Sequence, residues 1–214
     1  RLVHGSIVDA NARAIVLGVF RNVDPSGAAA AVDARLGGAI QEFTRRRMFN
    51  GGLGEISGLP PTRGLLLAES VMFVGLGDFD DFGAEAQSFV AGNIVRSLAL
   101  SGVEDFATVL FGAGSGVPVA AALEQQLGGF VAGLRDADPE RVVRRITICE
   151  IDPRRYASLR RAAFRLAGRL SGDTLRIVVD EAETPPAGAD EERARARLAA
   201  VRRTDPVYRL VNLL

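Results

Sequence analysis

Residues 107–134 read ATVLFGAGSGVPVAAALEQQLGGFVAGL. The apolar run 107–111 predicts a buried strand, and the apolar spacing after Val117 and Pro118 predicts a helix that continues to residue 134. Pro118 suits a first helical turn, because the N–H that it lacks would have no helical partner there. Glycines between a strand and a helix leave backbone N–H groups at the positive end of the helix, where proteins often hold phosphate. The turn 112–116 is therefore a candidate anion site, and the alternative is a tight turn with no ligand.

The length and composition predict one large folded domain, or one domain with an appendage. The chain has 214 residues, 48% of them hydrophobic, which is enough for a sizeable core. Its 26 basic and 26 acidic residues cancel, so the chain lacks the basic excess that is typical of non-specific nucleic-acid binders. Every basic residue is an arginine, which excludes a catalytic lysine.

A single cysteine, Cys149, excludes an intrachain disulfide and favours a reducing, cytoplasmic setting. Its place in an apolar run predicts a buried core residue. No stretch reaches the roughly 20 apolar residues that a membrane span needs.

The order of apolar runs predicts an α/β fold with three α-β-α layers around a mixed, mostly parallel, twisted sheet. Strands are expected at 2–8, 14–20, 64–67, 70–74, 107–111, 142–151 and 175–179, with a short edge strand within 49–59. Helices are expected at 28–36, 39–47, 84–100, 118–134 and 154–169. Such sheets bind ligands beyond the carboxyl ends of their strands, where this sequence has Gly75, Gly77 and the turn 112–116.

The composition changes after residue 180. We expect residues 1–180 to form the α/β domain and residues 181–214 to hold an acidic linker, a connecting helix and the start of a following domain. The chain begins without Met and stops inside an apolar run, and its many Ala, Gly and Arg residues indicate a GC-rich genome. We therefore expect a fragment of a longer bacterial protein.

No catalytic constellation is evident. One histidine and one cysteine are too few for a zinc site, and no G-x-S-x-G, P-loop or complete dinucleotide-binding motif is present. His4 is expected to be structural or exposed. The acidic cluster Asp78, Asp80 and Asp81 is better explained as a turn that caps the helix from Ala84 than as a cation site.

Three segments carry a resemblance to a known family. The runs AIVLGVF at 14–20, SGAAAAVDARLGGAIQEF at 26–43 and VGLG at 74–77 before a helix resemble the N-terminal domain of the leucyl aminopeptidases, which has a macro-domain-like fold. The resemblance extends over about residues 2–179. In those enzymes a separate C-terminal domain binds two metals and performs the chemistry, so the resemblance implies no peptidase activity for this chain.

Two segments look closer to macro domains proper. His4-Gly5-Ser6-Ile7 before the A-I-V run is similar to that family's G-D-I motif, and residues 112–118 are similar to its phosphate-binding loop. The resemblance implies that the loop would hold the diphosphate of ADP-ribose and that Ser6 stands where an acid contacts the adenine. The candidate ligand-binding residues are Gly112, Ala113, Gly114, Ser115, Gly116, Val117, Ser6, Gly75, Gly77, Ser26 and Gly27.

The sequence also departs from macro domains. Ser6 lacks the charge of the acid, residues 17–20 replace an Asn-rich strand end, and only Ser26 and Gly27 remain of a glycine triplet. The groups that are missing are those associated with removing ADP-ribose from proteins. We therefore expect no catalytic residue, no metal and no cofactor, with ADP-ribose or a related nucleotide as the candidate ligand.

The expected function is a non-catalytic, macro-like ligand-sensing or regulatory module of a larger bacterial protein. One alternative is a structural interaction or oligomerisation domain without a ligand, and another is a weak ADP-ribosyl hydrolase that uses Asn22 or Asp24. The expected partners are other domains of the parent protein, or a second copy of the chain, and neither nucleic acid nor a membrane.

Overall fold

The computed structural model describes residues 1–62, 64–112 and 117–170, all within a compact unit that spans Arg1–Asp180. The described residues form a central sheet of six strands, in the order β1-β6-β5-β2-β4-β3. All neighbouring strands are parallel except β3 and β4, which are antiparallel. The strands are β1 Leu2–His4, β2 Ala14–Val19, β3 Ile56–Leu59, β4 Ser70–Gly75, β5 Asp105–Thr108 and β6 Arg145–Glu150.

Strand β2 lies in the middle of the sheet and packs on both faces. Ala14 and Val16 belong to one core cluster and Ile15, Leu17 and Val19 to another, because successive side chains of a strand point to opposite faces. Burial on both faces explains why this strand reads as a continuous apolar run, as the sequence predicts.

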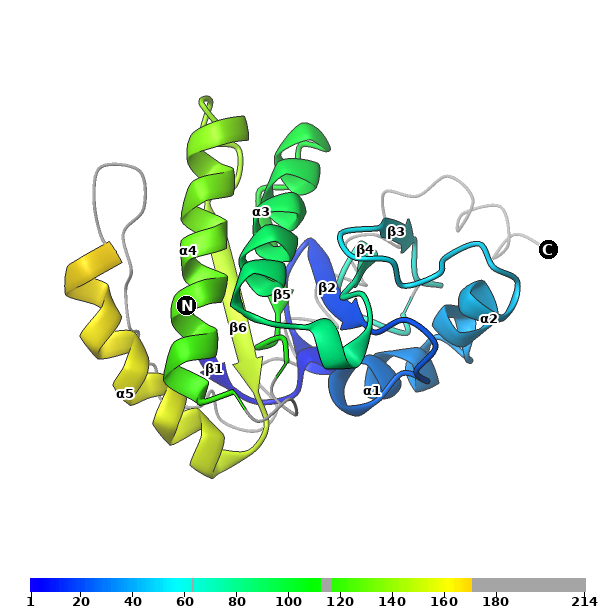
Figure 1. Cartoon of the computed structure of the whole chain (residues 1–214). Helices are drawn as coiled ribbons and strands as arrows, with labels where there is room; N and C mark the ends of the chain where they lie inside the picture. The colour runs from blue at the N-terminus through cyan, green and yellow to red at the C-terminus, as the bar shows by residue number, and fades with distance from the viewer. Residues whose placement is uncertain (63, 113–116, 171–214) are drawn as a thin grey trace. The chain divides into compact units, whose positions relative to one another are not determined.

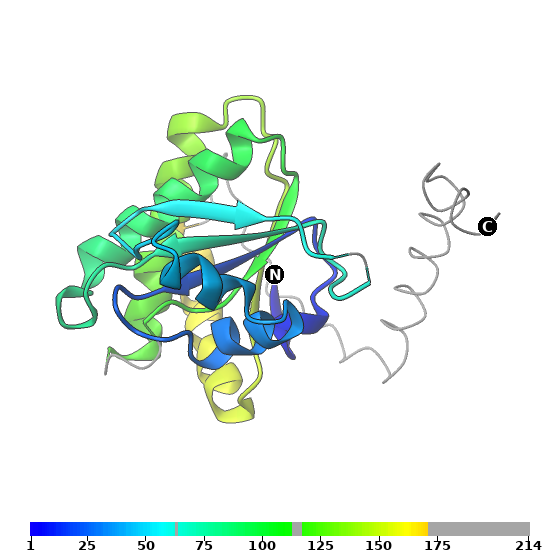
Figure 2. The ribbon, with the colours of Figure 1, turned by 90° about the vertical axis from the view of Figure 1, so that its right-hand side faces the viewer.

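Helices cover both faces of the sheet. The helices α3 (Ala84–Leu100), α4 (Val119–Ala137) and α5 (Pro153–Leu170) pack on one face, where α3 lies beside α4 and α4 beside α5 (Figure 1). The short helices α1 (Gly27–Arg35) and α2 (Ala39–Arg45) pack with Phe49 and Phe73 on the other face. The three-layer α-β-α arrangement with a mixed, mostly parallel sheet is thus confirmed. Figure 2 looks onto the β3 edge of this sheet.

Several element boundaries differ from the prediction. The first strand ends at His4, because the chain turns into a 3-10 helix, Ile7–Asp9, whose first turn is capped by the Ser6 hydroxyl accepting from the Val8 N–H. Residues 64–67 are not a strand, and only Leu66 makes an isolated bridge. The expected strand at 175–179 and the expected segments of 181–214 lie outside the described residues.

Helix α3 has the predicted bounds, but one residue of its predicted apolar face is exposed. Val90, Ile94, Val95 and Leu98 are buried as predicted, whereas Phe89 is 49% exposed. The ring of Phe89 lies against Gly54, where a Cβ would stand 2.6 Å from Cε1 of Phe89 and where φ is +76°, a left-handed value that favours glycine. The helix ends as predicted at Gly102 (φ +69°), where the Val103 N–H donates to the Leu98 carbonyl at 2.9 Å.

Helices α3 and α4 approach each other closely through small residues. A Cβ at Gly129 would lie 2.3 Å from the Ser88 carbonyl oxygen, and one at Gly133 would lie 2.7 Å from the Gly92 carbonyl oxygen. These contacts involve backbone atoms, which cannot turn aside as a flexible side chain can. The distance between the two helices therefore depends on these glycines.

Adjacent glycines of α4 allow a matched test of this packing. We expect Gly129→Ala to lower the free energy of unfolding by about 1–3 kcal/mol, because overpacking outweighs the gain in helix propensity. Gly128→Ala should instead raise it by about 0.5–1 kcal/mol, because no atom lies within 4 Å of the added methyl. Urea denaturation of both variants measures the difference, and equal effects would contradict the close helix contact.

Candidate functional site

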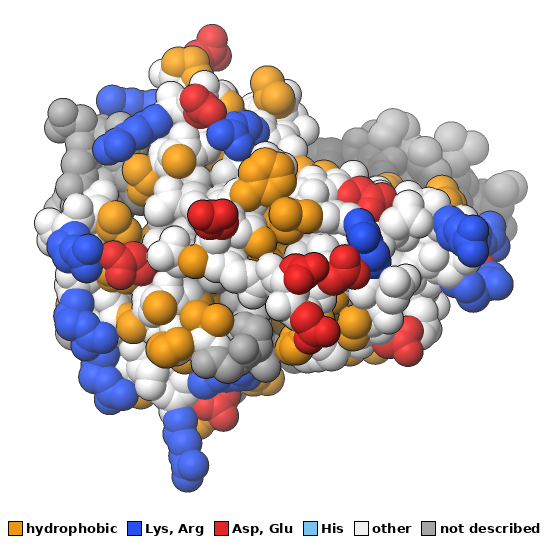
Figure 3. Space-filling view, in the orientation of Figure 1, with side chains coloured by type: hydrophobic (Ala, Val, Ile, Leu, Met, Phe, Trp, Pro, Cys, Tyr) orange, Lys and Arg blue, Asp and Glu red, His pale blue; other side chains and the backbone are white. Residues whose placement is uncertain are grey.

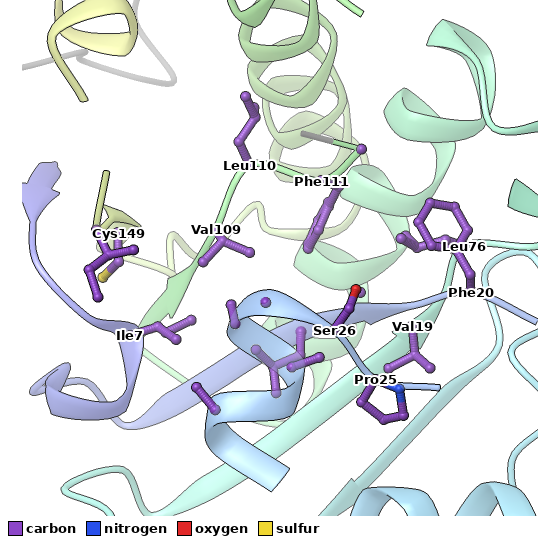
Figure 4. Close-up of a pocket in the computed structure, with 18 of the residues that line it drawn as sticks. Ile7, Val19, Phe20, Pro25, Ser26, Leu76, Val109, Leu110, Phe111 and Cys149 are labelled. Atoms are coloured by element: carbon purple, nitrogen blue, oxygen red, sulfur yellow. The ribbon is translucent and has the colours of Figure 1, made fainter. Parts of the chain in front are cut away.

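A cavity of about 550 Å³ opens at the carboxyl ends of the parallel strands. Its walls come from five places: residues 5–7 after β1, residues 17–20 at the end of β2, residues 23–31 around the start of α1, residues 109–112 after β5 and residues 149–151 at the end of β6 (Figure 4). Leu76 and Phe79 close one side and Arg155 another. The volume is within the roughly 300–1,000 Å³ typical of small-molecule sites.

The lining is largely apolar. Ile7, Val19, Phe20, Val109 and Phe111 are among the apolar side chains around the space in Figure 4. The polar side chains in the lining are those of Ser6, Asp24, Ser26, Glu150 and Arg155. Such a lining suits a flat apolar ring system that carries a few polar groups.

The amino end of α1 supplies one wall of the cavity. Ser26 is the N-cap residue, but its hydroxyl makes no capping hydrogen bond, and the first turn contains no acidic residue. Gly27 has φ +53°, a left-handed value that favours glycine. The Ala29 and Ala30 N–H groups donate to the Ser26 carbonyl, at 3.1 and 3.4 Å. The Gly27 and Ala28 N–H groups have no partner among the described residues, so they and the positive end of the helix dipole remain available to an anion in the cavity.

The structure brings some of the predicted residues together and separates others. Ser6, Ser26, Gly27 and Gly112 all line the cavity. Ala113, Gly114, Ser115 and Gly116 lie outside the described residues, and Val117 is 38% exposed and is not part of the described lining. Of the predicted glycine-rich turn 112–116, only Gly112 is thus among the described residues.

Gly75 and Gly77 do not line the cavity and instead pack against the loop at 51–55. The Gly75 N–H donates to the Glu55 carbonyl at 2.7 Å, and the Gly77 N–H donates to the Gly51 carbonyl at 3.0 Å. A Cβ at Gly75 would stand 1.9 Å from the Gly52 carbonyl oxygen. The close approach of two backbones explains Gly75, and of the turn 75–77 only Leu76 belongs to the described lining of the cavity.

Two buried glutamines hold the segment that follows β5. Gln126 of α4 accepts from the Phe111 N–H at 2.9 Å and donates to the Val109 carbonyl at 2.9 Å. Gln87 of α3 donates to the Phe111 carbonyl at 3.1 Å and to Gln126 Oε1 at 3.4 Å. The sequence analysis did not select these residues, although a glutamine at 126 between the core positions Leu123 and Phe130 is a signal that could have found one of them.

Phe111 and Leu76 cover Gly18 of β2. A Cβ at Gly18 would lie 2.8 Å from Cδ1 of Leu76 and 3.0 Å from Cδ1 of Phe111. The space in which a side chain at position 18 would stand is therefore taken by two apolar side chains. No polar group can project into the cavity from this position of the strand.

Glu150 and Arg155 form a charged pair at the opposite wall. Glu150 is buried, Oε2 lies 3.4 Å from Nε of Arg155, and Oε1 accepts from the Asp152 N–H at 2.8 Å. Asp152 in turn accepts from the Arg155 N–H at 2.7 Å and caps α5, which confirms the predicted helix start. Arg155 remains partly exposed at the cavity, so its guanidinium can reach a ligand.

The remaining candidate groups have structural explanations. His4 is exposed, and its ring stacks on Tyr156 at a centroid distance of 5.0 Å. Asp78 pairs with Arg21 at 3.2 Å, and Gly83, not the acidic cluster, is the N-cap of α3, so the capping prediction is wrong. Across 1–62, 64–112 and 117–170, no cluster of three or more His, Cys, Asp or Glu residues could bind a metal.

Comparisons with known proteins give a family and a fold. The model of the cytosol aminopeptidase family, N-terminal domain, matches residues 16–134. A macrodomain mutant of Oceanobacillus iheyensis solved with ADPR is 16% identical, with a TM-score of 0.64, over 77% of this chain and 91% of that one. A Trypanosoma brucei macrodomain in complex with ADP-ribose is 17% identical, with a TM-score of 0.61, over 74% of this chain and 66% of that one.

A tomato leucine aminopeptidase mutant is 14% identical, with a TM-score of 0.52, and the match covers 78% of this chain but 36% of the tomato chain. Comparison with curated protein sequences gives no match. The structural likeness establishes a macrodomain-like fold, as the sequence predicts. None of the helices in the described part of the chain is long and apolar enough to cross a membrane.

The hydrogen bonds of Gln126 predict that an apolar substitution of similar size at this position lowers stability strongly. We expect Gln126→Met to lower the free energy of unfolding by roughly 2–4 kcal/mol, because it leaves the buried Phe111 N–H without a partner and the Val109 carbonyl with only the Thr108 hydroxyl at 3.4 Å. The control is Gln125→Met on the same helix, which should change stability by less than about 0.5 kcal/mol. Urea denaturation measures the free energy of unfolding of both variants. A Gln126→Met variant as stable as the wild type would contradict the conclusion that Gln126 holds the segment after β5.

The burial of Cys149 at the floor of the cavity leads to a prediction about the reactivity of its thiol. Loss of hydration raises the pKa of its thiol to about 12 from an ordinary 9.0, so the native thiol stays protonated at neutral pH. We expect a thiol-specific disulfide reagent to leave the native protein unmodified near pH 8 and to label the thiol in guanidinium.

The same shift predicts how stability depends on pH. The unfolded chain loses the thiol proton first, so the contribution of Cys149 should decline as the pH rises from about 9 toward 12. Comparison of the wild type with Cys149→Ala over that range isolates this contribution. Rapid labelling of the native protein near pH 8 would contradict both predictions.

Proposed function

This chain belongs to the cytosol aminopeptidase family, N-terminal domain, and on that premise we propose that it is a non-catalytic ligand-binding module. The ligand is ADP-ribose or a related nucleotide, held in the cavity at the carboxyl ends of the strands. The module regulates other domains of a larger protein in response to this ligand. The observation that carries the proposal is the cavity itself, in which the open amino end of α1 faces an apolar lining.

The two kinds of wall correspond to the two ends of a nucleotide. The Gly27 and Ala28 N–H groups at the start of α1 offer donors to a phosphate. Ile7 and Cys149 provide an apolar surface on which a base can lie. The solved macrodomains with ADPR and ADP-ribose support this choice of ligand, since they have the same fold.

The polar lining supports binding more than catalysis. Ser6 is engaged with the Val8 N–H, and Glu150 with Asp152 and Arg155, so neither is placed to activate water. Asp24 is exposed and accepts from Gln41 at 3.5 Å, while Asn22 lies in a neighbouring hollow, not in the described lining of this cavity. A weak hydrolase would have to rely on Asp24, which makes this the less favoured activity.

A purely structural module is the second candidate, and a specific contact favours it. Phe111 and Leu76 occupy the space above Gly18, as side chains do where a binding cleft has been filled. In this case the cavity would be a residual space, and the domain would serve to pack against other domains or a second copy.

Calorimetric titration with ADP-ribose, ADP, AMP and adenosine tests the proposal. We expect binding that strengthens from adenosine to the diphosphates, and at least about tenfold weaker binding for Ala28→Asp, since a carboxylate at the wall repels phosphate. An acidic residue in a first helical turn favours the helix, so the variant should fold. The control is Ala84→Asp, the same change in the first turn of α3, away from the cavity.

Each outcome decides between the candidates. A loss of affinity in Ala28→Asp alone supports a nucleotide site at α1. The absence of heat with all four compounds, from folded protein, would overturn the proposal in favour of the structural module. Release of free ADP-ribose from a modified protein substrate, abolished in Asp24→Ala, would instead support the hydrolase.

A further inference from the structure

Helix α5 is rich in unbalanced positive charge. Its 18 residues, Pro153–Leu170, include six arginines and no acidic residue, although the whole chain has as many acids as bases. The arginines are Arg154, Arg155, Arg160, Arg161, Arg165 and Arg169. Figure 3 shows the corresponding blue side chains along the margin of the molecule formed by this helix. The neutral net charge of the chain therefore hides a local basic surface.

Five of these arginines fall into two groups, and the sixth, Arg160, contacts Phe164. Arg155 pairs with Glu150 and Arg169 pairs with Glu124, and both pairs join α5 to neighbouring elements. Arg154, Arg161 and Arg165 are exposed, and in the described residues none of them forms an ion pair. We call these three residues the arginine stripe. Within the described residues, Arg161 donates to the Ser158 hydroxyl of the same helix at 3.2 Å, and no ion pair joins the arginine stripe to another element.

The helical repeat puts the arginine stripe on one line. Steps of seven and four residues keep side chains on the same side of a helix, and the stripe extends over about 16 Å at 1.5 Å per residue. Arg161 and Arg165 are one turn apart, a like-charge spacing that costs an isolated helix a few tenths of a kcal/mol. The arrangement suits a row of negative charges that relieves this repulsion.

Phe164 adds an aromatic contact to the same surface. Its side chain is 49% exposed, and the guanidinium of Arg160 lies 5.6 Å from its ring centroid. Arginines beside an exposed aromatic ring are the groups with which proteins bind single-stranded nucleic acids, by phosphate contacts and base stacking.

The apolar residues of α5 argue against a membrane as the partner. A helix that lies in a membrane surface inserts its apolar face. In α5 that face is used, because Leu159, Ala162, Ala163 and Leu166 are buried against α4 and the sheet. Phe164 alone would remain to insert, whereas the arginine stripe stays exposed along most of the helix.

We propose that the outer face of α5 binds the phosphate backbone of single-stranded RNA or DNA through Arg154, Arg161 and Arg165, with Phe164 stacking on a base. The zero net charge of the chain led to the expectation that it does not bind nucleic acid. The proposal departs from that expectation, because binding depends on the local distribution of charge and not on its sum. The surface is separate from the nucleotide cavity, since none of these four residues lines that cavity.

Fluorescence anisotropy with a labelled oligothymidine of about 20 nucleotides tests this proposal. Three phosphate contacts predict a salt slope of about −2, so that affinity falls roughly 20-fold between 50 and 200 mM salt. The variant Arg154→Gln/Arg161→Gln/Arg165→Gln should bind at least tenfold more weakly, with a slope near zero. Phe164→Ala should weaken binding at least fivefold without changing the slope.

The chain offers a control with the same change in net charge. Arg45→Gln/Arg46→Gln/Arg47→Gln also removes three neighbouring arginines, at the end of α2, and should leave the affinity within about twofold. Circular dichroism and thermal midpoints show that both triple variants fold. Calorimetry with ADP-ribose should be unaffected by the α5 variant, which separates this proposal from that for the cavity.

Three outcomes would overturn the proposal: no binding of the oligonucleotide near 50 mM salt, equal losses in both triple variants, or binding of phosphatidylserine vesicles in place of the oligonucleotide.

Discussion

The fold depends on how the chain leaves the sheet after Thr108. Strand β5 ends there, but the chain continues along the cavity through half-buried Val109 and buried Leu110 and Phe111, without pairing with a neighbouring strand. Buried backbone groups without hydrogen bonds are costly, so this path is stable only if side chains provide partners. Gln87 and Gln126 do so from two different helices. The same contacts therefore join α3 and α4, fix the strand end and place Phe111 beside the cavity.

This arrangement explains why the cavity is apolar on one side and open to polar groups on the other. The strand ends bring core residues to the cavity floor, because a central parallel sheet is buried on both faces. The start of α1 brings backbone donors, because the first turn of any helix has N–H groups without helical partners. Neither feature requires a charged side chain, which is consistent with a chain in which acids and bases balance. Charge gathers elsewhere, on α5.

Much of the fold could be predicted from local sequence. The run at 14–20 has the continuous apolar character of a strand buried on both faces, and Asp152 before Pro153 has the chemistry of a helix start. The end of β5 could not be predicted from its own residues, because apolar Val109 and Leu110 suit a strand as well as a buried coil. Hydrogen bonds from Gln126, 15 residues later, decide between the two.

The site was less accessible to sequence reasoning. In a sequence, a glycine that makes room for a ligand cannot be told from one that makes room for another backbone segment. Gly75 is of the second kind, because it packs against the backbone of Gly52. Phe89 fits the apolar period of α3, yet its ring is half-exposed, because the residue that packs on it, Gly54, has no side chain. The contribution of Glu150 and Arg155 to the cavity depends on the pairing of β1 with β6, which brings residues 5–7 beside residues 149–151.

The pairing of β1 with β6 also governs the order of events during synthesis. Leu2 lies opposite Ile148 and His4 opposite Glu150, so β1 has no partner strand among the described residues until β6 has been made. Strands β2, β3 and β4 can pair much earlier, because all three lie within residues 14–75. Contacts between distant parts of a chain form slowly, since the intervening loop must close first. Strand β1 must therefore remain unpaired while the rest of the sheet forms, and the cavity, to which Ser6 and Glu150 both contribute, is complete only once β6 pairs with β1.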